Sequence, residues 1–177
     1  MNTQRRHPNV VHVSELEEER DFTGTKFGFA VKELSDATDA RGIGCSWYEV
    51  PPGRSAFPLH YHCANEEALY VLEGHGDLQF GTDHVALRPG DYVTFPVGPE
   101  AAHKLTNTGT TPLRYLCMAT MIPTEVVGYP DSGKIGARGA KARGDGTETV
   151  WVRHRTFQSA AVEYFAGEDT GEVVTEK

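Results

Sequence analysis

The chain has 177 residues, of which 38% are hydrophobic and 24% are charged, so it can bury the core of one domain with a short appendage. Its formal net charge of −8 at pH 7 argues against nucleic acid or an anionic membrane as a partner, because both bind basic surfaces. No uncharged apolar run approaches the roughly 20 residues of a membrane span, and the first residues lack the apolar core of a signal peptide.

The three cysteines are Cys45, Cys63 and Cys117, and no two of them form a CxxC pair. An odd number without that spacing indicates neither a disulfide framework nor a cysteine-based zinc site. We therefore expect a reducing, cytoplasmic setting.

Residues 1–25 are predicted to form an N-terminal arm. Val10–Val13 has the composition of a short strand. Ser14 and Glu17 have the S-x-x-E spacing of a capping box, which predicts a short helix, and the acidic residues suit a helix N-terminus. A solvated acidic turn fits the same residues equally well.

Residues 26–136 alternate between short β-rich segments and Gly- or Pro-containing breaks. The predicted strands are Lys26–Leu34, Ile43–Val50, Ala68–Glu73, Asp77–Gly81, His84–Leu87, Tyr92–Phe95, Lys104–Asn107, Leu113–Met121 and Val126–Tyr129. This close and regular spacing predicts an all-β sandwich or barrel. A mixed α/β sheet would need helical patterns of 10–15 residues between the strands, and this region contains none.

Residues 137–177 are expected to form a loop and a C-terminal tail. The glycines and charges of residues 137–149 predict a loop, and Val150–Arg153 predicts a strand. Apolar residues between Phe157 and Phe165 recur with helical periodicity, which predicts a helix ending near Gly167, although Tyr164–Phe165 would also suit a strand. The aromatic residues of this tail are expected to pack on the barrel or on a partner subunit.

His60 and His62 are the most informative residues of the chain. On a strand they share one face, with Cα atoms ~6.6 Å apart, so both rings can reach one ion at about 2.1 Å. A carboxylate a few residues later and a third histidine on a neighbouring strand would complete a site with positions left open on the metal. An isolated histidine would be weak support for a metal, and the combination carries the prediction.

Two spaced motifs extend this pattern. The first reads Gly53-x6-His60-x-His62-x4-Glu67-x6-Gly74, and the second reads Gly90-x5-Pro96-x-Gly98-x4-His103-x3-Asn107. Over about residues 40–122, the chain resembles the cupin superfamily, whose two motifs have nearly this form. One extra residue precedes His60 and two precede His103, and these departures fall where loops enter strands.

The resemblance implies an all-β, cupin-type jelly-roll β-barrel over residues 26–136. It also implies a metal site whose ligands are His60, His62, Glu67 and His103. Glu66 is the competing carboxylate, and the spacing to Gly74 favours Glu67. The cofactor would be one divalent transition metal, with Fe, Mn, Ni, Cu and Zn all compatible with these ligands.

The glycines of the motifs have expected structural roles. Gly74 and Gly90 would supply turns with positive φ, and Gly98 a bend before the third histidine. Asn107 is expected to be a turn residue and not a ligand.

In function, the resemblance implies a metal-dependent enzyme that acts on a small organic substrate by oxygenation or by isomerisation or cyclisation. A non-catalytic protein that binds or senses a small molecule or a metal is the alternative. No general base outside the ligand set stands out in the sequence. Related barrels pair, so a homodimer is expected, and neither nucleic acid nor a membrane is expected as a partner.

Overall fold

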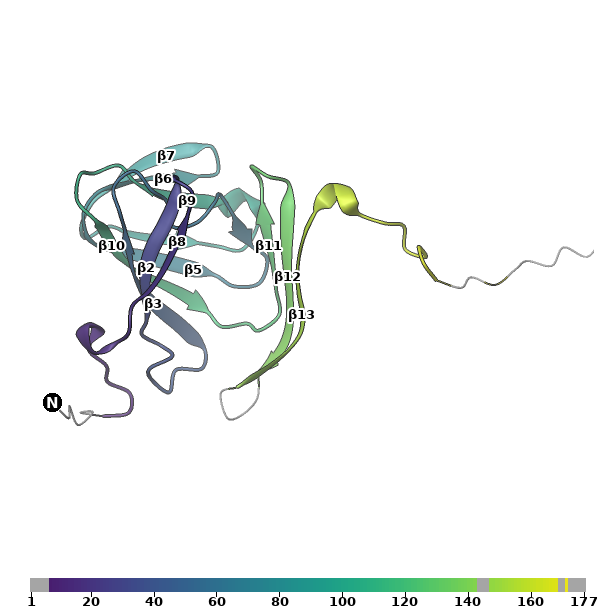
Figure 1. Ribbon diagram of the computed structural model, residues 1–177, viewed down its shortest axis with the longest axis horizontal. Coiled ribbons are helices and arrows are strands. Elements are labelled where there is room, and N and C mark those ends of the chain that lie inside the picture. The colour runs from purple at the N-terminus through teal and green to yellow at the C-terminus, as the bar shows by residue number, and fades with distance from the viewer. Residues whose placement is uncertain (1–6, 143–146, 169–170, 172–177) are drawn as a thin grey trace, which may run out of the picture.

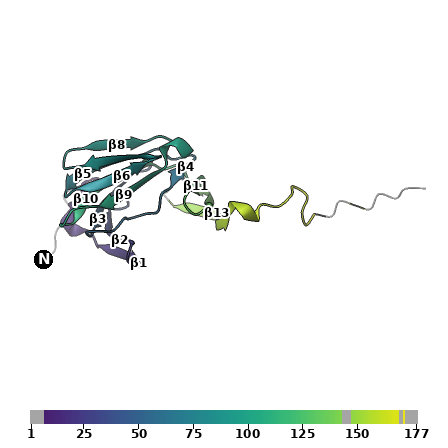
Figure 2. The same cartoon turned by 90° about the horizontal axis from the view of Figure 1, so that it is seen from above.

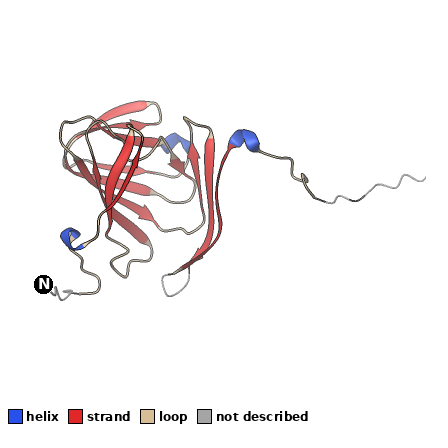
Figure 3. Cartoon of the chain, viewed as in Figure 1, coloured by secondary structure: helices blue, strands red, loops and turns tan. Residues whose placement is uncertain are grey.

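The computed structural model describes residues 7–142, 147–168 and 171. Within these ranges the regular structure consists of β-strands and of three single-turn 3-10 helices: η1 (Val13–Glu15), η2 (Pro99–Ala101) and η3 (Gln158–Ala160). Figure 3 shows how far strands dominate the molecule. No helix in the described part of the chain is long and apolar enough to cross a membrane.

The largest sheet has six antiparallel strands in the order β1-β2-β3-β10-β5-β8. Their bounds are β1 (Glu19–Thr23), β2 (Phe27–Glu33), β3 (Ile43–Val50), β10 (Leu113–Thr120), β5 (Glu67–Glu73) and β8 (Tyr92–Phe95). In Figure 2 this sheet runs from β8 at the top of the molecule to β1 at the bottom.

Two smaller antiparallel sheets complete the jelly roll. One has the order β7-β6-β9 and the other β13-β12-β11-β4. Their bounds are β7 (Asp83–Leu87), β6 (Gly76–Phe80), β9 (His103–Asn107), β13 (Glu148–Phe157), β12 (Lys134–Ala142), β11 (Glu125–Tyr129) and β4 (Tyr61–His62). The strands β11, β12 and β13 lie side by side at one end of the molecule (Figure 1).

The hydrophobic core lies between the six-stranded and three-stranded sheets. Its buried side chains are Val50, Ala56, Leu69, Val71, Leu78, Leu87, Phe95, Leu105, Leu113 and Tyr115. On β5 and β9 the buried residues alternate, as expected for strands with one face toward a core. The all-β jelly-roll fold expected from the sequence is therefore confirmed.

The N-terminal segment differs in detail from its prediction. Val10 makes only an isolated bridge with His7, so the predicted strand at Val10–Val13 is wrong. The short helix is a single 3-10 turn, and its N-cap is His12, whose Nδ1 accepts a hydrogen bond from the Ser14 amide at 3.2 Å. Strand β1, which pairs with β2, lies within the residues expected to form an arm.

The C-terminal segment differs more than the N-terminal segment from its predicted secondary structure. Residues 137–142 belong to β12 and not to a loop, because pairing with β13 extends the hairpin through its glycines and alanines. Residues 143–146 lie outside the described residues. The predicted helix after Phe157 is also wrong, since the chain forms one 3-10 turn and then irregular turns.

The tail leaves its aromatic residues uncovered. Phe157, Tyr164 and Phe165 are 57%, 90% and 64% exposed, and the tail extends away from the sheets in both Figure 1 and Figure 2. The expectation that these residues pack on the barrel of their own chain is therefore wrong. Packing on a partner subunit stays a prediction.

Two motif glycines adopt the backbone conformation expected of them. Gly74 has φ 82° and Gly90 has φ 95°. Gly74 is also sterically required, because a Cβ there would lie 2.8 Å from Leu113 Cα. The turn after β5 thus leads directly into β6 without displacing β10.

Candidate metal centre

His60 and His103 are joined by backbone hydrogen bonds at the start of β9. The His60 amide donates to the His103 carbonyl at 3.2 Å, and the His103 amide donates to the His60 carbonyl at 2.8 Å. Their ring centroids lie 4.5 Å apart. Two residues later, His62 ends the short strand β4, and its ring centroid lies 5.2 Å from that of His60.

Glu67 enters the same space from the first position of β5. Its Oε2 lies 3.4 Å from His62 Nε2 and 3.3 Å from His103 Nε2. Ligand atoms of His60, His62 and Glu67 lie within 4.8 Å of one another, and His103 adjoins this group through Glu67. The structure therefore brings together the four side chains that the motifs single out, whereas Glu66 is exposed.

Each of the three histidines has its Nδ1 atom next to a hydrogen-bond acceptor. His60 Nδ1 lies 2.9 Å from Pro58 O, and His103 Nδ1 lies 3.0 Å from Ala101 O. His62 Nδ1 lies 3.3 Å from Glu125 Oε2. These partners favour the tautomer with the proton on Nδ1, which leaves the Nε2 lone pair available to a metal.

Glu125, at the start of β11, is a functional residue that the sequence reasoning missed. It is buried, and its carboxylate accepts hydrogen bonds from the backbone amides of Cys63, Ala64 and Asn65 at 2.9–3.1 Å. It also orients His62, as described above. No motif marked this residue, because its contacts lie some 60 residues away in the chain.

The electrostatics of the site follow from burial and mutual contact. Burial and the neighbouring His103 ring lower the pKa of His60 from 6.5 to about 4, so that its neutral form prevails. Burial alone would raise the pKa of Glu67, but its close contact with His103 and the other two nearby histidines outweighs the effect of burial and lowers that pKa. The pKa of Glu125 is likewise lowered, because hydrogen bonds from Asn65 outweigh the effect of its burial.

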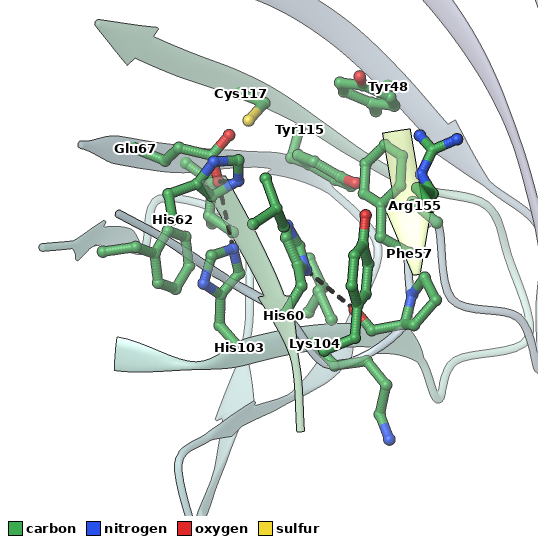
Figure 4. A pocket seen from close by; sticks show the side chains of 17 residues that line it. Tyr48, Phe57, His60, His62, Glu67, His103, Lys104, Tyr115, Cys117 and Arg155 are labelled. Carbon is green, nitrogen blue, oxygen red and sulfur yellow. Dashed lines mark hydrogen bonds and ion pairs between the residues drawn. The ribbon is translucent and has the colours of Figure 1, made fainter. Parts of the chain in front are cut away.

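The four side chains line a cavity of about 300 Å³. Most of its remaining wall is apolar or aromatic, and its other polar groups are Tyr48, Lys104, Tyr115, Cys117, Tyr129 and Arg155. Figure 4 shows Glu67 and His62 at one side of this cavity and Arg155 well apart from them, beyond Tyr115. Tyr48 and Tyr115 stack on each other with ring centroids 5.3 Å apart, and both line this cavity.

Asn107 has the structural role expected of it. It is completely buried, and its Nδ2 donates to Val50 O at 2.8 Å and to Thr111 O at 2.9 Å. Its Oδ1 accepts a hydrogen bond from the Gly109 amide at 2.9 Å. Asn107 thus holds the turn after β9 and contributes no ligand.

The donor set fits a divalent transition metal. Three imidazoles with available Nε2 atoms and one ionised carboxylate are ligands that Zn, Fe, Mn, Ni and Cu accept. The acceptors behind the Nδ1 atoms are the kind of partners that orient histidine ligands in metal sites. His60, His62, Glu67 and His103 are the residues that would hold the ion.

Comparison with known proteins supports this description. A sequence model of the cupin domain matches residues 46–119. An uncharacterized protein of Methanocaldococcus jannaschii is 35% identical over 95 residues, which are 52% of this chain and 74% of that protein.

Two solved structures cover more of the chain. A putative sugar phosphate isomerase from Acidithiobacillus ferrooxidans is 28% identical with a TM-score of 0.67, over 81% of this chain and 91% of that one. A sugar phosphate isomerase of the cupin superfamily from Silicibacter pomeroyi has a TM-score of 0.71 over 86% of this chain and 94% of that one. At 22% identity, the second is a likeness of fold alone.

Proposed function

Because the chain belongs to the cupin superfamily, we propose that it is a metal-dependent enzyme that isomerises a small hydroxy-carbonyl compound. The observation that carries this proposal is the meeting of three imidazoles and one carboxylate at the wall of a cavity large enough for a small organic molecule. His60, His62, Glu67 and His103 would be the ligands of one divalent metal.

A bound divalent metal would supply a Lewis acid that polarises a carbonyl or enol oxygen, as isomerisation requires. Two observations favour isomerisation over oxygenation. The 28% identical structure that covers most of this chain is described as a putative sugar phosphate isomerase. The cavity is also rich in tyrosines, whose hydroxyl groups can donate hydrogen bonds to the oxygen atoms of a hydroxylated substrate.

The residues of the chain would position such a substrate and exclude water around it. Phe57, Leu69 and Phe95 supply apolar surface, and the Tyr48 and Tyr115 rings stack against one another along one wall. Burial raises the pKa of both tyrosines, so their hydroxyl groups stay protonated and act as donors at neutral pH.

One observation favours binding without turnover as the second candidate. Among the described residues that line the cavity, the only carboxylate and the only imidazoles are the four proposed ligands. A base outside the ligand set would have to be Lys104, Cys117 or a tyrosine, and burial raises the pKa of Cys117, Tyr48 and Tyr115, which keeps these three protonated. A cavity without a separate carboxylate or imidazole suits a protein that holds a metal and a small molecule without converting it.

The experiment that tests the proposal begins with the metal content of the purified protein. It then follows interconversion of aldoses and ketoses, with and without a phosphate group, alongside oxygen consumption. Activity should disappear with a chelator and return with added metal, and Glu67→Gln should reduce it strongly while the exposed neighbour variant Glu66→Gln should not.

Protein without bound metal after metal-supplemented expression would overturn the proposal. Full metal content without conversion of any compound would favour the binding alternative. Oxygen uptake that depends on an added substrate would replace isomerisation with oxygenation.

We also propose that the chain forms a homodimer. Trp151, Phe157, Tyr164 and Phe165 are all more than half exposed, and a second copy would cover such aromatic surface. Light scattering coupled to size-exclusion chromatography should give the mass of two chains for the full protein, and a monomer mass for the full protein would contradict this.

A further inference from the structure

One cationic side chain of the cavity comes from outside the matched cupin domain. Arg155 belongs to β13, pairs in register with Gly136 of β12, and lines the same cavity as the proposed metal ligands. In the close-up, Arg155 lies on the same side of the cavity as Phe57 and Tyr48, well apart from Glu67 (Figure 4). The cavity therefore has a metal-binding end and a cationic end.

Arg155 makes no ion pair with a described residue, and the same holds for Arg88 and Arg153. Unlike those two arginines, Arg155 lines the cavity that holds the proposed metal ligands. An arginine without an acidic partner on a chain of net charge −8 is a binding group for an oxyanion, since its planar donors match carboxylate and phosphate.

A second cation lies close by. Arg155 also lines a neighbouring hollow, which shares Phe57 and Tyr129 with the cavity and includes Lys134. Lys134 Nζ lies 5.1 Å from the centre of the Tyr129 ring and makes no ion pair with a described residue. The carboxylate of Asp21 lines this hollow as well, but no ion pair joins it to either cation.

Between the two ends lies the hydroxyl of a buried tyrosine, Tyr115. Tyr115 is only 4% exposed, and its hydroxyl is not hydrogen bonded to any described residue. No fully enclosed side-chain oxygen or nitrogen lacks a partner in the described part of the chain, so this hydroxyl opens onto the cavity. A buried hydroxyl aimed into a cavity is a donor for a ligand that occupies it.

We propose that the ligand of this cavity is a small hydroxylated compound with a terminal oxyanion, phosphate or carboxylate, which Arg155 binds at the cavity end opposite to the metal. Lys134 adds positive charge beside this anion, and the Tyr115 hydroxyl donates to an oxygen in the middle of the ligand. This inference rests on the proposed function, because it assigns the two ends of the substrate of the same site.

The test measures binding of three probes to the metal-loaded full chain: ribose 5-phosphate, gluconate and uncharged ribose. Wild type should bind at least one anionic probe about tenfold or more tightly than ribose, as expected for charge-assisted hydrogen bonds to an anion. Arg155→Met should abolish that preference without changing ribose binding, and Arg155→Lys should restore part of it.

The matched control is Arg88→Met, which removes an exposed arginine of the β7–β8 turn, away from the cavity lining. It should keep the preference of the wild type. Tyr115→Phe should weaken binding of charged and uncharged probes alike. Tighter binding of ribose 5-phosphate than of gluconate identifies phosphate as the anion, and the reverse order identifies carboxylate.

Metal content is measured for every variant, so that a failure of the anion subsite can be distinguished from a failure of the proposed metal-dependent function. Equal affinity of the wild type for ribose and both anions, or no saturable binding of either anion up to millimolar concentration, overturns the anion subsite while leaving the metal site intact. An unchanged preference in Arg155→Met has the same consequence. Wild-type protein that cannot be loaded with metal overturns the proposed function instead.

Discussion

The matched cupin domain and the C-terminal hairpin β12–β13 build the same cavity by different means. The domain supplies His60, His62, Glu67 and His103 from strands whose backbones are paired and whose side chains are largely buried. The hairpin supplies Arg155 from an exposed strand. Under the two proposals, the paired strands of the domain hold the metal, and the peripheral strand β13 selects the small molecule that reaches it.

The cupin domain joins the sheet of the C-terminal hairpin through a short contact between strands β4 and β11, which we call the seam. Strand β4 pairs with β11 only at His62 with Val127 and at Tyr61 with Gly128. Glu125 reinforces this seam, since its carboxylate bonds to the backbone after His62 and to the His62 ring. The same short contact therefore positions one proposed ligand and anchors the sheet that carries Arg155.

The largest expected effect comes from removing a proposed metal ligand of the cupin domain. His62→Ala should remove metal from the protein and lower its melting temperature. An ion that binds only the native state stabilises it by about 2.7 kcal/mol at 100 times its Kd. Elemental analysis and thermal unfolding with and without a chelator measure both effects. His84→Ala, at an exposed histidine of β7, is the control. An unchanged melting curve with full metal content in His62→Ala would contradict the ligand assignment.

Removing the negative charge of Glu125 at the seam should have the next largest effect. Glu125→Gln keeps the shape of the side chain but weakens the acceptor behind His62 Nδ1, and loss of such partners typically costs about 10–100-fold in metal affinity. Competition with a metal-binding dye measures the change. Glu163→Gln, at an exposed position of the tail, should bind metal like the wild type. Equal affinity in Glu125→Gln would mean that Glu125 is only a structural anchor.

A steric clash between β11 and β4 should have a somewhat smaller effect on the protein. A Cβ at Gly128 would overlap the Tyr61 ring, so Gly128→Ala should lower the free energy of unfolding by about 1–3 kcal/mol, as overpacking does. Urea denaturation gives the value. Gly139→Ala is the matched control on the hairpin, because its added Cβ would meet Val152 only at ordinary contact distance, 3.4 Å. Equal unfolding midpoints for the two variants would show that the Tyr61 ring moves aside without cost.

The smallest expected effect is the pH dependence of the unfolding free energy of the metal-free protein, which His60 of the cupin domain should cause. The pKa of His60 is about 4 in the folded state and 6.5 in the unfolded chain, so the unfolded state binds more protons between these values. Stability should therefore fall as pH decreases through this range, by at most about 1.4 kcal/mol per pH unit. Urea midpoints of the chelator-treated protein from pH 7 to pH 5 test this. His60→Gln should flatten the profile, and an equally steep profile in that variant would assign the slope to another group.

The two regions also differ in how far the sequence foretold them. The strand positions of the cupin domain were predicted to within one or two residues, because alternating apolar residues and Gly or Pro turns report directly on strands with one buried face. Strand β4 was absent from the predicted strands, although the ligand argument placed His60 and His62 on a strand, because two residues carry no periodicity. In the hairpin, Val150–Arg153 was correctly predicted as a strand, whereas residues 137–142 of β12 were predicted as a loop, because glycines and charges on a solvated strand look like a loop in sequence.

By itself, the amino-acid sequence determined the all-β class and the shared face of His60 and His62, because the spacing of residues along a strand controls which face they share. Its two motifs, through their resemblance to the cupin superfamily, identified the turn glycines and the four side chains that the structure brings together. Only the tertiary structure decided which group hydrogen bonds to the His62 ring and which group lies across the cavity from the four side chains. Glu125 reaches His62 across some 60 residues of chain, and Arg155 reaches the cavity from a strand whose placement depends on sheet pairing. Such contacts between distant segments leave no local pattern in the sequence, since they depend on how the sheets pack.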